Sequence, residues 1–136
     1  MGAALHGGRW NPAGVEVVYT SSTASLCLLE SLANIATDDF MPGTYTLTQV
    51  NISGSVAIEY VFDELLPLDW DSLVYRPEPQ ALGGQWAAEL RSGVLSVPSS
   101  ILPAERNLIL NPAHPSFPGI EFLEPKPFTF DPRLRK

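Results

Sequence analysis

The first half of the chain alternates short β-branched segments with one segment of helical periodicity. Residues 15–20 are rich in valine and precede a cluster of serines and threonines, which predicts a short buried strand. Leucine and alanine then recur at intervals of three and four residues, which predicts a helix over about residues 23–36. Residues 44–52 alternate with a phase shift that favours a bulged strand, and residues 56–62 predict a strand or a strand leading into a turn.

Proline shapes the second half of the pattern. Eleven of the thirteen prolines lie at or after Pro67, and eight fall between Pro98 and Pro132, which excludes long helices from that region. One helix fits before this group, over residues 80–92, and Gly93 would end it. Short strands are expected at residues 94–97, 107–110, 120–123 and 128–130.

Strands grouped around two helices, without regular β-α-β alternation, predict a single α+β domain over residues 1–136. A chain of this length removes roughly 70% of its unfolded surface from water, so it can form a sizeable core. One cysteine excludes an internal disulfide. No apolar run approaches the roughly 20 residues that span a bilayer, and no signal peptide is visible, so we expect a cytoplasmic protein without membrane association.

Charge is distributed unevenly along the chain. The formal net charge is -7 at pH 7, and residues 1–75 hold nine acidic side chains and one basic side chain, Arg9. An acidic surface repels phosphate backbones, so we expect no direct binding of nucleic acid by this chain.

Arg9 is the first candidate functional residue, because it lies in a glycine-rich turn formed by residues 7–12. Glycines let the backbone approach a ligand closely, and a guanidinium can hold carboxylate or phosphate oxygens in a fork. The alternative is a surface turn in which Arg9 pairs with one of the nearby acids.

Glu30 is the second candidate, because Leu28, Leu29 and Leu32 surround it on the predicted helix. A partly buried carboxylate must be paired or must serve a ligand. The alternative is a boundary residue that bonds to a strand amide or to Arg9.

Ser99 follows a predicted strand, and a Ser99, His114, Glu30 triad can be written. The glycines of a nucleophile elbow are missing around the serine, which argues against a serine hydrolase. His6, Cys27 and His114 show no metal-ligand spacing, so no metal site is expected.

Six segments that occur in order along the chain resemble the RES domain family. They cover nearly the whole sequence, which makes the combination specific although each segment alone is a weak signal. They are GGRWNP (7–12), VVYTS (17–21), LLE (28–30), VPS (97–99), NLILNP (107–112) with HP (114–115), and FDPRL (130–134).

The resemblance implies a bacterial toxin of a type II toxin–antitoxin pair, neutralised by an Xre-like helix-turn-helix antitoxin. It also implies a fold similar to that of ADP-ribosyltransferases, with a mixed β-sheet and a few helices. Characterised members consume NAD by hydrolysis, by phosphorolysis or by transfer of ADP-ribose to a protein, and they need no metal. Any contact with DNA would then come from the antitoxin.

The resemblance also implies roles for individual residues. It places Arg9 and Tyr19 in the NAD pocket, with Glu30 and Ser99 completing it. Glu30 would stabilise oxocarbenium character on the ribose while the nicotinamide bond breaks, and Arg9 would neutralise the pyrophosphate. Tyr19 would stack on or bond to the nicotinamide ribose, and Ser99 would orient the ring or the ribose.

An alternative expectation concerns the start of the domain. Members of the family usually begin with an earlier strand that carries a further arginine for NAD, whereas Met1 stands almost directly before the glycine-rich turn. The alternative is therefore a truncated, weakly active or inactive domain that acts mainly as the binding partner of an Xre-like antitoxin.

Overall fold

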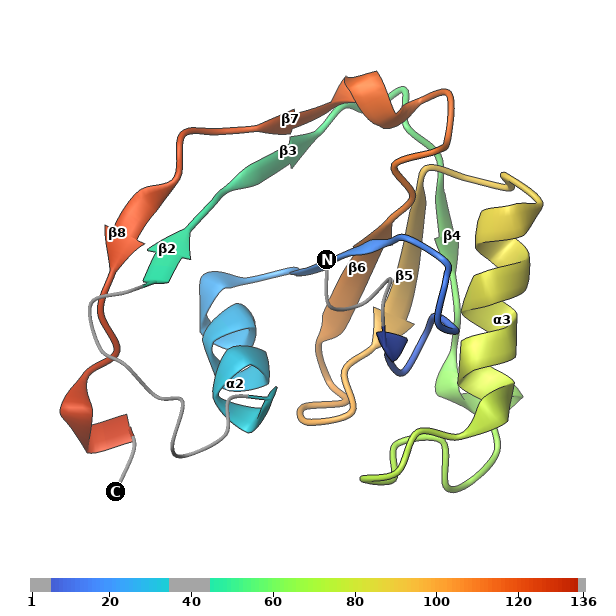
Figure 1. The fold of residues 1–136 in the computed structure, drawn as a ribbon, viewed down its shortest axis with the longest axis horizontal. Helices are drawn as coiled ribbons and strands as arrows, with labels where there is room; N and C mark the ends of the chain where they lie inside the picture. Colours follow the sequence, from blue (N-terminus) through green and yellow to red (C-terminus); the bar gives the residue numbers. More distant parts are fainter. Residues whose placement is uncertain (1–5, 35–44, 135–136) are drawn as a thin grey trace.

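A mixed four-stranded sheet forms the centre of the molecule (Figure 1). The computed structural model describes residues 6–34 and 45–134. The order of the strands in the sheet is β1, β6, β5, β4; β6 is antiparallel to β1 and β5, and β4 is parallel to β5. The strands are β1 (Val18–Ser21), β4 (Ile58–Tyr60), β5 (Val94–Pro98) and β6 (Arg106–Leu110). The predicted α+β class and mixed sheet are confirmed.

Strand β5 is buried at every position, because both faces of the sheet are covered. Leu95 and Val97 face one hydrophobic cluster with Ile109 of β6, and Val94 faces a second cluster with Leu110 of β6. Successive side chains of a strand point to opposite faces, so a strand between two cores reads as a continuous apolar run. In β5 the one polar exception is Ser96, whose hydroxyl accepts a hydrogen bond of 2.7 Å from Nε of Arg106.

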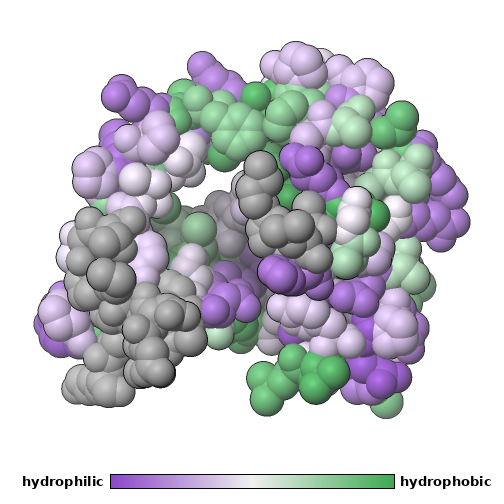
Figure 2. All heavy atoms as spheres, viewed as in Figure 1, coloured by the Kyte–Doolittle hydropathy of each residue, from purple (hydrophilic) through white to green (hydrophobic). Residues whose placement is uncertain are grey.

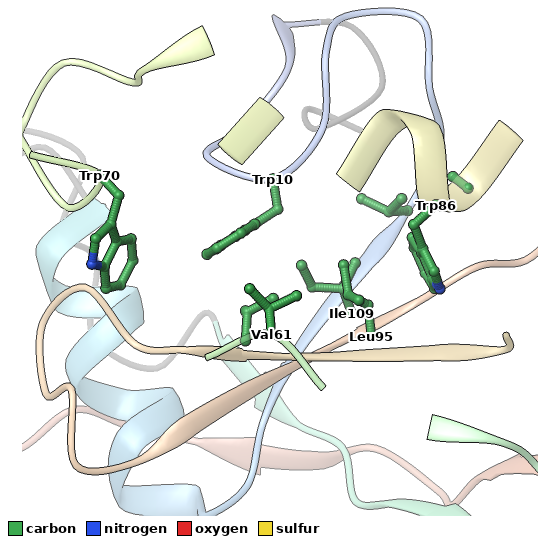
Figure 3. Packing of buried hydrophobic residues seen from close by; sticks show 9 residues of the cluster. Trp10, Val61, Trp70, Trp86, Leu95 and Ile109 are labelled. Atoms are coloured by element: carbon green, nitrogen blue, oxygen red, sulfur yellow. The ribbon is translucent and has the colours of Figure 1, made fainter. Parts of the chain in front are cut away.

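Three tryptophans dominate the first cluster (Figure 3). The rings of Trp10 and Trp70 lie 5.8 Å apart at 45°. The ring of Trp86 is completely buried, and its indole N–H donates to the hydroxyl of Ser92 over 2.8 Å. Ser92 in turn donates to the carbonyl of Val94, so the polar end of the indole is satisfied inside the core.

Helix α3 (Pro77–Ala88) covers the face of the sheet that carries this cluster. The helix was predicted over residues 80–92, and both ends were wrong. The start is earlier because Pro77 occupies the first turn, where a missing N–H costs nothing. The end is earlier because Leu90 adopts a φ of +52°, which reverses the chain before Gly93.

Helix α2 (Ala24–Asn34) agrees with the predicted helix within the described residues. Its start is fixed by Thr23, whose hydroxyl accepts the backbone N–H of Leu26 over 3.1 Å. Leu26 is completely buried, and Glu30 lies one turn further along the same face of the helix. No described helix is both long and apolar enough to cross a membrane.

Two antiparallel ribbons form an arch beside the central sheet (Figure 1). Strand β2 (Tyr45–Leu47) pairs with β8 (Lys126–Phe128), and β3 (Val50–Ile52) pairs with β7 (Ile120–Phe122). The predicted bulged strand is thus two strands, because its phase shift falls where the chain changes partners. Short 3₁₀ turns complete the fold at Asp63–Leu65, Phe117–Gly119 and Pro132–Leu134.

The other strand predictions are correct in place and differ at their ends, except that the strand predicted over residues 128–130 is wrong beyond its first residue. Strand β1 begins at Val18 rather than at residue 15, and β4 is shorter than the apolar run that predicted it. Strand β8 ends at Phe128. The ring of Phe130 follows the strand and packs edge-on against Phe128 at 5.0 Å and against Tyr45 at 4.9 Å, which explains why its apolar character was read as strand.

Candidate functional site

A cavity of about 1170 Å³ opens between α2, the end of β1, the turn that carries Arg9, and the ribbon of β2 and β8. Figure 2 shows the surface hollowed beneath the arch. Arg9, Tyr19, Glu30 and Asn107 all line this cavity. Small-molecule pockets usually enclose about 300 to 1000 Å³, so the cavity can accommodate a ligand as large as a dinucleotide.

Strand register places the polar side chains of the site on one face of the sheet. Tyr19 lies opposite Ile109, and Ser21 lies opposite Asn107. Ile109 belongs to the core under α3, and Asn107, two residues earlier on β6, lies on the same face of the sheet. This face is therefore apolar beneath α3 and polar beside α2. The site is therefore a continuation of the main core face.

Glu30 points from α2 onto this polar part of the sheet. Its Oε2 accepts a hydrogen bond of 2.8 Å from the hydroxyl of Ser99, and a further close one from the side-chain amide of Asn107. The two donors come from the loop after β5 and from β6. The sequence had suggested a strand amide or Arg9 as structural partners of Glu30, whereas the observed donors are the side chains of Ser99 and Asn107.

Ser99 is completely buried and does not line the cavity. Its hydroxyl accepts the backbone N–H groups of Ile101, over 3.1 Å, and Leu102, over 3.0 Å, and donates to Glu30. Ser99 thus reaches the site through Glu30. The side chain of His114 bonds to Ser116 instead, at the end of β5 opposite to Ser99, so no serine hydrolase triad is assembled.

Tyr19 ends among tightly packed groups of the glycine-rich turn. Its hydroxyl donates to Oδ1 of Asn11 over 2.5 Å and accepts the backbone N–H of Trp10 over 3.2 Å. Burial of the hydroxyl raises the pKa of Tyr19 to about 12, and the hydrogen bond from the Trp10 backbone lowers the pKa by a smaller amount. A Cβ on Gly8 would lie 2.7 Å from the Tyr19 hydroxyl, so only glycine allows this approach.

Arg9 is anchored by one nitrogen of its guanidinium. Its Nη1 donates to the carbonyls of Trp70 and Ser72, both over 2.9 Å, and the guanidinium lies 5.1 Å from the centre of the Tyr75 ring. Within the described residues, Arg9 forms no ion pair, so the predicted pairing with an acid is not found there. Among the described residues that line the cavity, Arg9 is the one Lys or Arg side chain.

The structure therefore brings together Arg9, Tyr19 and Glu30 in one cavity and places Ser99 behind Glu30. No group of His, Cys, Asp and Glu side chains with metal-binding geometry occurs in residues 6–34 and 45–134. Sequence reasoning missed Asn107 as a site residue. The available signal was an asparagine at the start of an apolar strand. Its pairing with Ser21 depends on the strand register, which the sequence does not reveal.

Comparison with known proteins gives consistent matches over the whole chain. A model of the RES domain family matches residues 1–131. A protein of Sphingobium sp. strain YBL2 named "Prs ADP-ribosylating toxin" is 35% identical over 98% of this chain and 83% of that protein. A protein of Yersinia enterocolitica named "Toxin Res" is 36% identical over 98% of this chain and 88% of that protein.

A solved structure shares the fold. The matching chain comes from the Mycobacterium tuberculosis MbcT–MbcA toxin–antitoxin complex and superposes with a TM-score of 0.73 at 20% sequence identity. The match covers 98% of this chain and 77% of that chain. At this identity the likeness establishes the architecture described above.

Proposed function

Because the chain belongs to the RES domain family, we propose that it is the toxin of a toxin–antitoxin pair and that it consumes NAD in the cytoplasm. The proposed reaction breaks the bond between the nicotinamide nitrogen and C1′ of the attached ribose. Both bonding electrons leave with nicotinamide, which departs as a neutral ring. Water, phosphate or a nucleophilic side chain of an acceptor protein then bonds to C1′ and loses a proton.

The observation that carries this proposal is the Glu30 carboxylate, held by two donors at the wall of a cavity of dinucleotide size. Cleavage of the nicotinamide bond develops positive charge on the ribose ring, as in glycoside hydrolysis. A preorganised carboxylate stabilises that charge without having to reorient during the reaction. Ser99, which only reaches the cavity through Glu30, would act as a positioning residue.

Arg9 and Tyr19 would bind the remainder of the dinucleotide. The Nε and Nη2 groups of Arg9 form no hydrogen bond within the described residues, which leaves them available for pyrophosphate oxygens. Tyr19 is 40% exposed although its hydroxyl is engaged, so its ring can contact the ribose end of the ligand.

Nicotinamide release by the purified chain tests the proposal, with Glu30→Gln as the decisive variant. Loss of the carboxylate charge should lower kcat about 10²- to 10³-fold. Glu121→Gln is the matched control, because Glu121 is an exposed glutamate on β7 outside the cavity. Equal release by wild type and Glu30→Gln would refute the role of Glu30.

The same assay separates the three possible acceptors. A product that appears only with added phosphate indicates phosphorolysis, and label from NAD on a polypeptide indicates ADP-ribosylation of a protein. Release in phosphate-free buffer without labelled protein indicates hydrolysis. NAD that stays intact while an antitoxin still binds would favour the alternative, a domain that mainly binds its partner.

The proposed partner is an Xre-like helix-turn-helix antitoxin that covers the cavity. Residues 63–75, here called the rim segment, border the cavity at Asp71, Leu73 and Tyr75. Figure 2 shows an apolar cluster at the lower edge of the view, where Figure 1 places the loop before α3. Four leucine and valine side chains of the rim segment are at least 79% exposed: Leu65, Leu68, Leu73 and Val74.

The charge of the rim segment indicates which kind of partner surface can bind to it. The segment contains four acidic side chains, so a second copy of this chain would bring like charges together. An exposed apolar patch of this kind is typical of a protein interface. A basic antitoxin segment with an apolar ridge satisfies both properties.

A further inference from the structure

We infer that Asn107 is a positioning residue that, together with Ser99, fixes the Glu30 carboxylate with one oxygen held by the protein and the other presented to the substrate. We call these two hydrogen bonds, from Ser99 and Asn107 to Glu30, the clamp. The geometry of the clamp is independent of the reaction, whereas its effect on turnover rests on the proposed NAD cleavage. Asn107 forms part of the cavity wall, and its amide makes a close hydrogen bond to Oε2 of Glu30.

The orientation of the Asn107 amide satisfies a neighbour at each end. The hydroxyl of Ser21 donates to Oδ1 of Asn107 over 2.7 Å, so the amide oxygen faces β1 and the NH₂ group faces Glu30. The pairing of Ser21 with Asn107 in the β1–β6 register places the two side chains as neighbours. A carboxylate only accepts hydrogen bonds, so Glu30 requires the NH₂ end of the amide, and the Ser21 hydroxyl satisfies the oxygen that then faces β1.

The proton of Ser99 is directed to Glu30 in a similar way. The Ser99 oxygen accepts the two backbone N–H groups of Ile101 and Leu102, and its single O–H is then left to donate to Oε2. Both clamping donors therefore meet the same carboxylate oxygen. Within the described residues, Oε1 of Glu30 accepts no hydrogen bond, which leaves it for the ligand.

Two donors from different segments stop the carboxylate from rotating about its terminal bond. Preorganised groups stabilise a transition state well because they need not reorient while charge develops. Removing one donor frees that rotation and takes Oε1 away from the ribose for part of the time. The loss should therefore appear in kcat, while binding of the pyrophosphate through Arg9, and with it KM, changes little.

The kinetic test compares Asn107→Asp with wild type in the nicotinamide assay. Aspartate keeps the size of asparagine and the bond from Ser21 but turns a carboxylate oxygen toward Glu30. We expect kcat to fall about 10²-fold, the usual effect of displacing a reacting group slightly, with KM for NAD within about twofold. Asn107→Ala should give a smaller fall, because it removes the donor without adding repulsion.

A matched control exists on the arch. The side-chain amide of Asn51 also faces a glutamate oxygen, that of Glu121, at 3.4 Å, but neither residue lines the cavity. Asn51→Asp therefore creates the same pairing of two carboxylates away from the site and should leave kcat unchanged. Thermal unfolding of each variant shows whether the fold is intact. Wild-type kcat in a folded Asn107→Asp variant would overturn the inference.

A second measurement does not depend on activity. In a ¹⁵N-labelled sample, the Asn107 side-chain amide protons should resonate downfield and exchange slowly, and Glu30→Ala should move them upfield and accelerate their exchange. An Asn107 resonance that is identical in wild type and Glu30→Ala would overturn the clamp. If wild type releases no nicotinamide, the proposed function fails, and this measurement still decides whether the clamp exists.

Discussion

Tyr19 carries a titration that distinguishes it from an ordinary surface tyrosine. Its side chain is 40% exposed, yet its hydroxyl is enclosed between Trp10 and Asn11, and its pKa rises from 10.0 to about 12. The unfolded chain loses this proton near its ordinary pKa, before the folded chain does. Folding stability linked to Tyr19 is therefore complete below about pH 10 and is lost as the pH rises through about 12.

Alkaline titration of tyrosinate absorbance should show a late step near pH 12 that belongs to Tyr19. The variant Tyr19→Phe should lack this late step, and its stability should fall less steeply above pH 10 because the linked proton is gone. The matched variant Tyr60→Phe removes a tyrosine that is 54% exposed and should keep the late step. Persistence of that step in Tyr19→Phe would assign it to another residue.

At the same scale, the sequence suggested some site residues and concealed others. Arg9 stood out as the single base among nine acids, and Glu30 stood out as a carboxylate among leucines, because both signals are local. Asn107 gave no such signal. Its importance comes from Ser21 on one side and Glu30 on the other, and both contacts depend on packing between segments far apart in the chain.

Helix α3 packs closely against the glycine-rich turn, and the tightest approach is at Gly83. A Cβ on Gly83 would lie 1.7 Å from the backbone carbonyl oxygen of Trp10, so the helix and the turn touch without an intervening side chain. Trp10 is 3% exposed and belongs to the core under α3. The distance between α3 and the turn at Gly83 therefore determines where the turn that carries Arg9 can lie.

Gly83→Ala should destabilise the protein by about 2 to 3 kcal/mol, because the methyl group must push the helix from the turn against a packed core. Chemical denaturation measures this change. Gly54→Ala is the control, since a Cβ on Gly54 meets nothing within 4 Å, and its effect should stay within about 0.5 kcal/mol. Equal free energies of unfolding for the two variants would show that the turn can move away from the helix without loss of stability.

Prediction of the elements succeeded where burial imposes a repeating pattern and failed where the chain changes partners. The apolar character of β5, interrupted only at Ser96, and the three-and-four spacing of α2 each follow from the surfaces that they contact. The ends of α3 depend on a proline in its first turn and on the left-handed Leu90, which hydrophobic spacing does not encode. The division of residues 45–52 into β2 and β3 depends on two different partner strands.

At the scale of the whole molecule, the rim segment combines exposed leucines with acidic side chains beside the cavity. The double variant Leu65→Ser, Leu68→Ser should weaken binding of the antitoxin at least tenfold, because it removes apolar contact area from the proposed interface. Nicotinamide release and thermal stability should stay near wild type, since these side chains are 79% and 102% exposed and do not line the cavity.

Isothermal calorimetry with the purified antitoxin measures this effect. The matched control is Leu134→Ser, which removes a leucine that is 46% exposed in the C-terminal 3₁₀ turn, outside the rim segment. Unchanged affinity of the double variant would locate the antitoxin on another surface.

Strand β5 separates two hydrophobic clusters and supplies side chains to both. Neither cluster can open without exposing one side of the same strand, so the two should melt in one cooperative transition rather than in sequence. In hydrogen exchange, the amides of β5 should report global unfolding, whereas the three-residue strands of the arch should exchange through smaller openings. A lesion in either cluster would then destabilise the entire sheet on which the site is built.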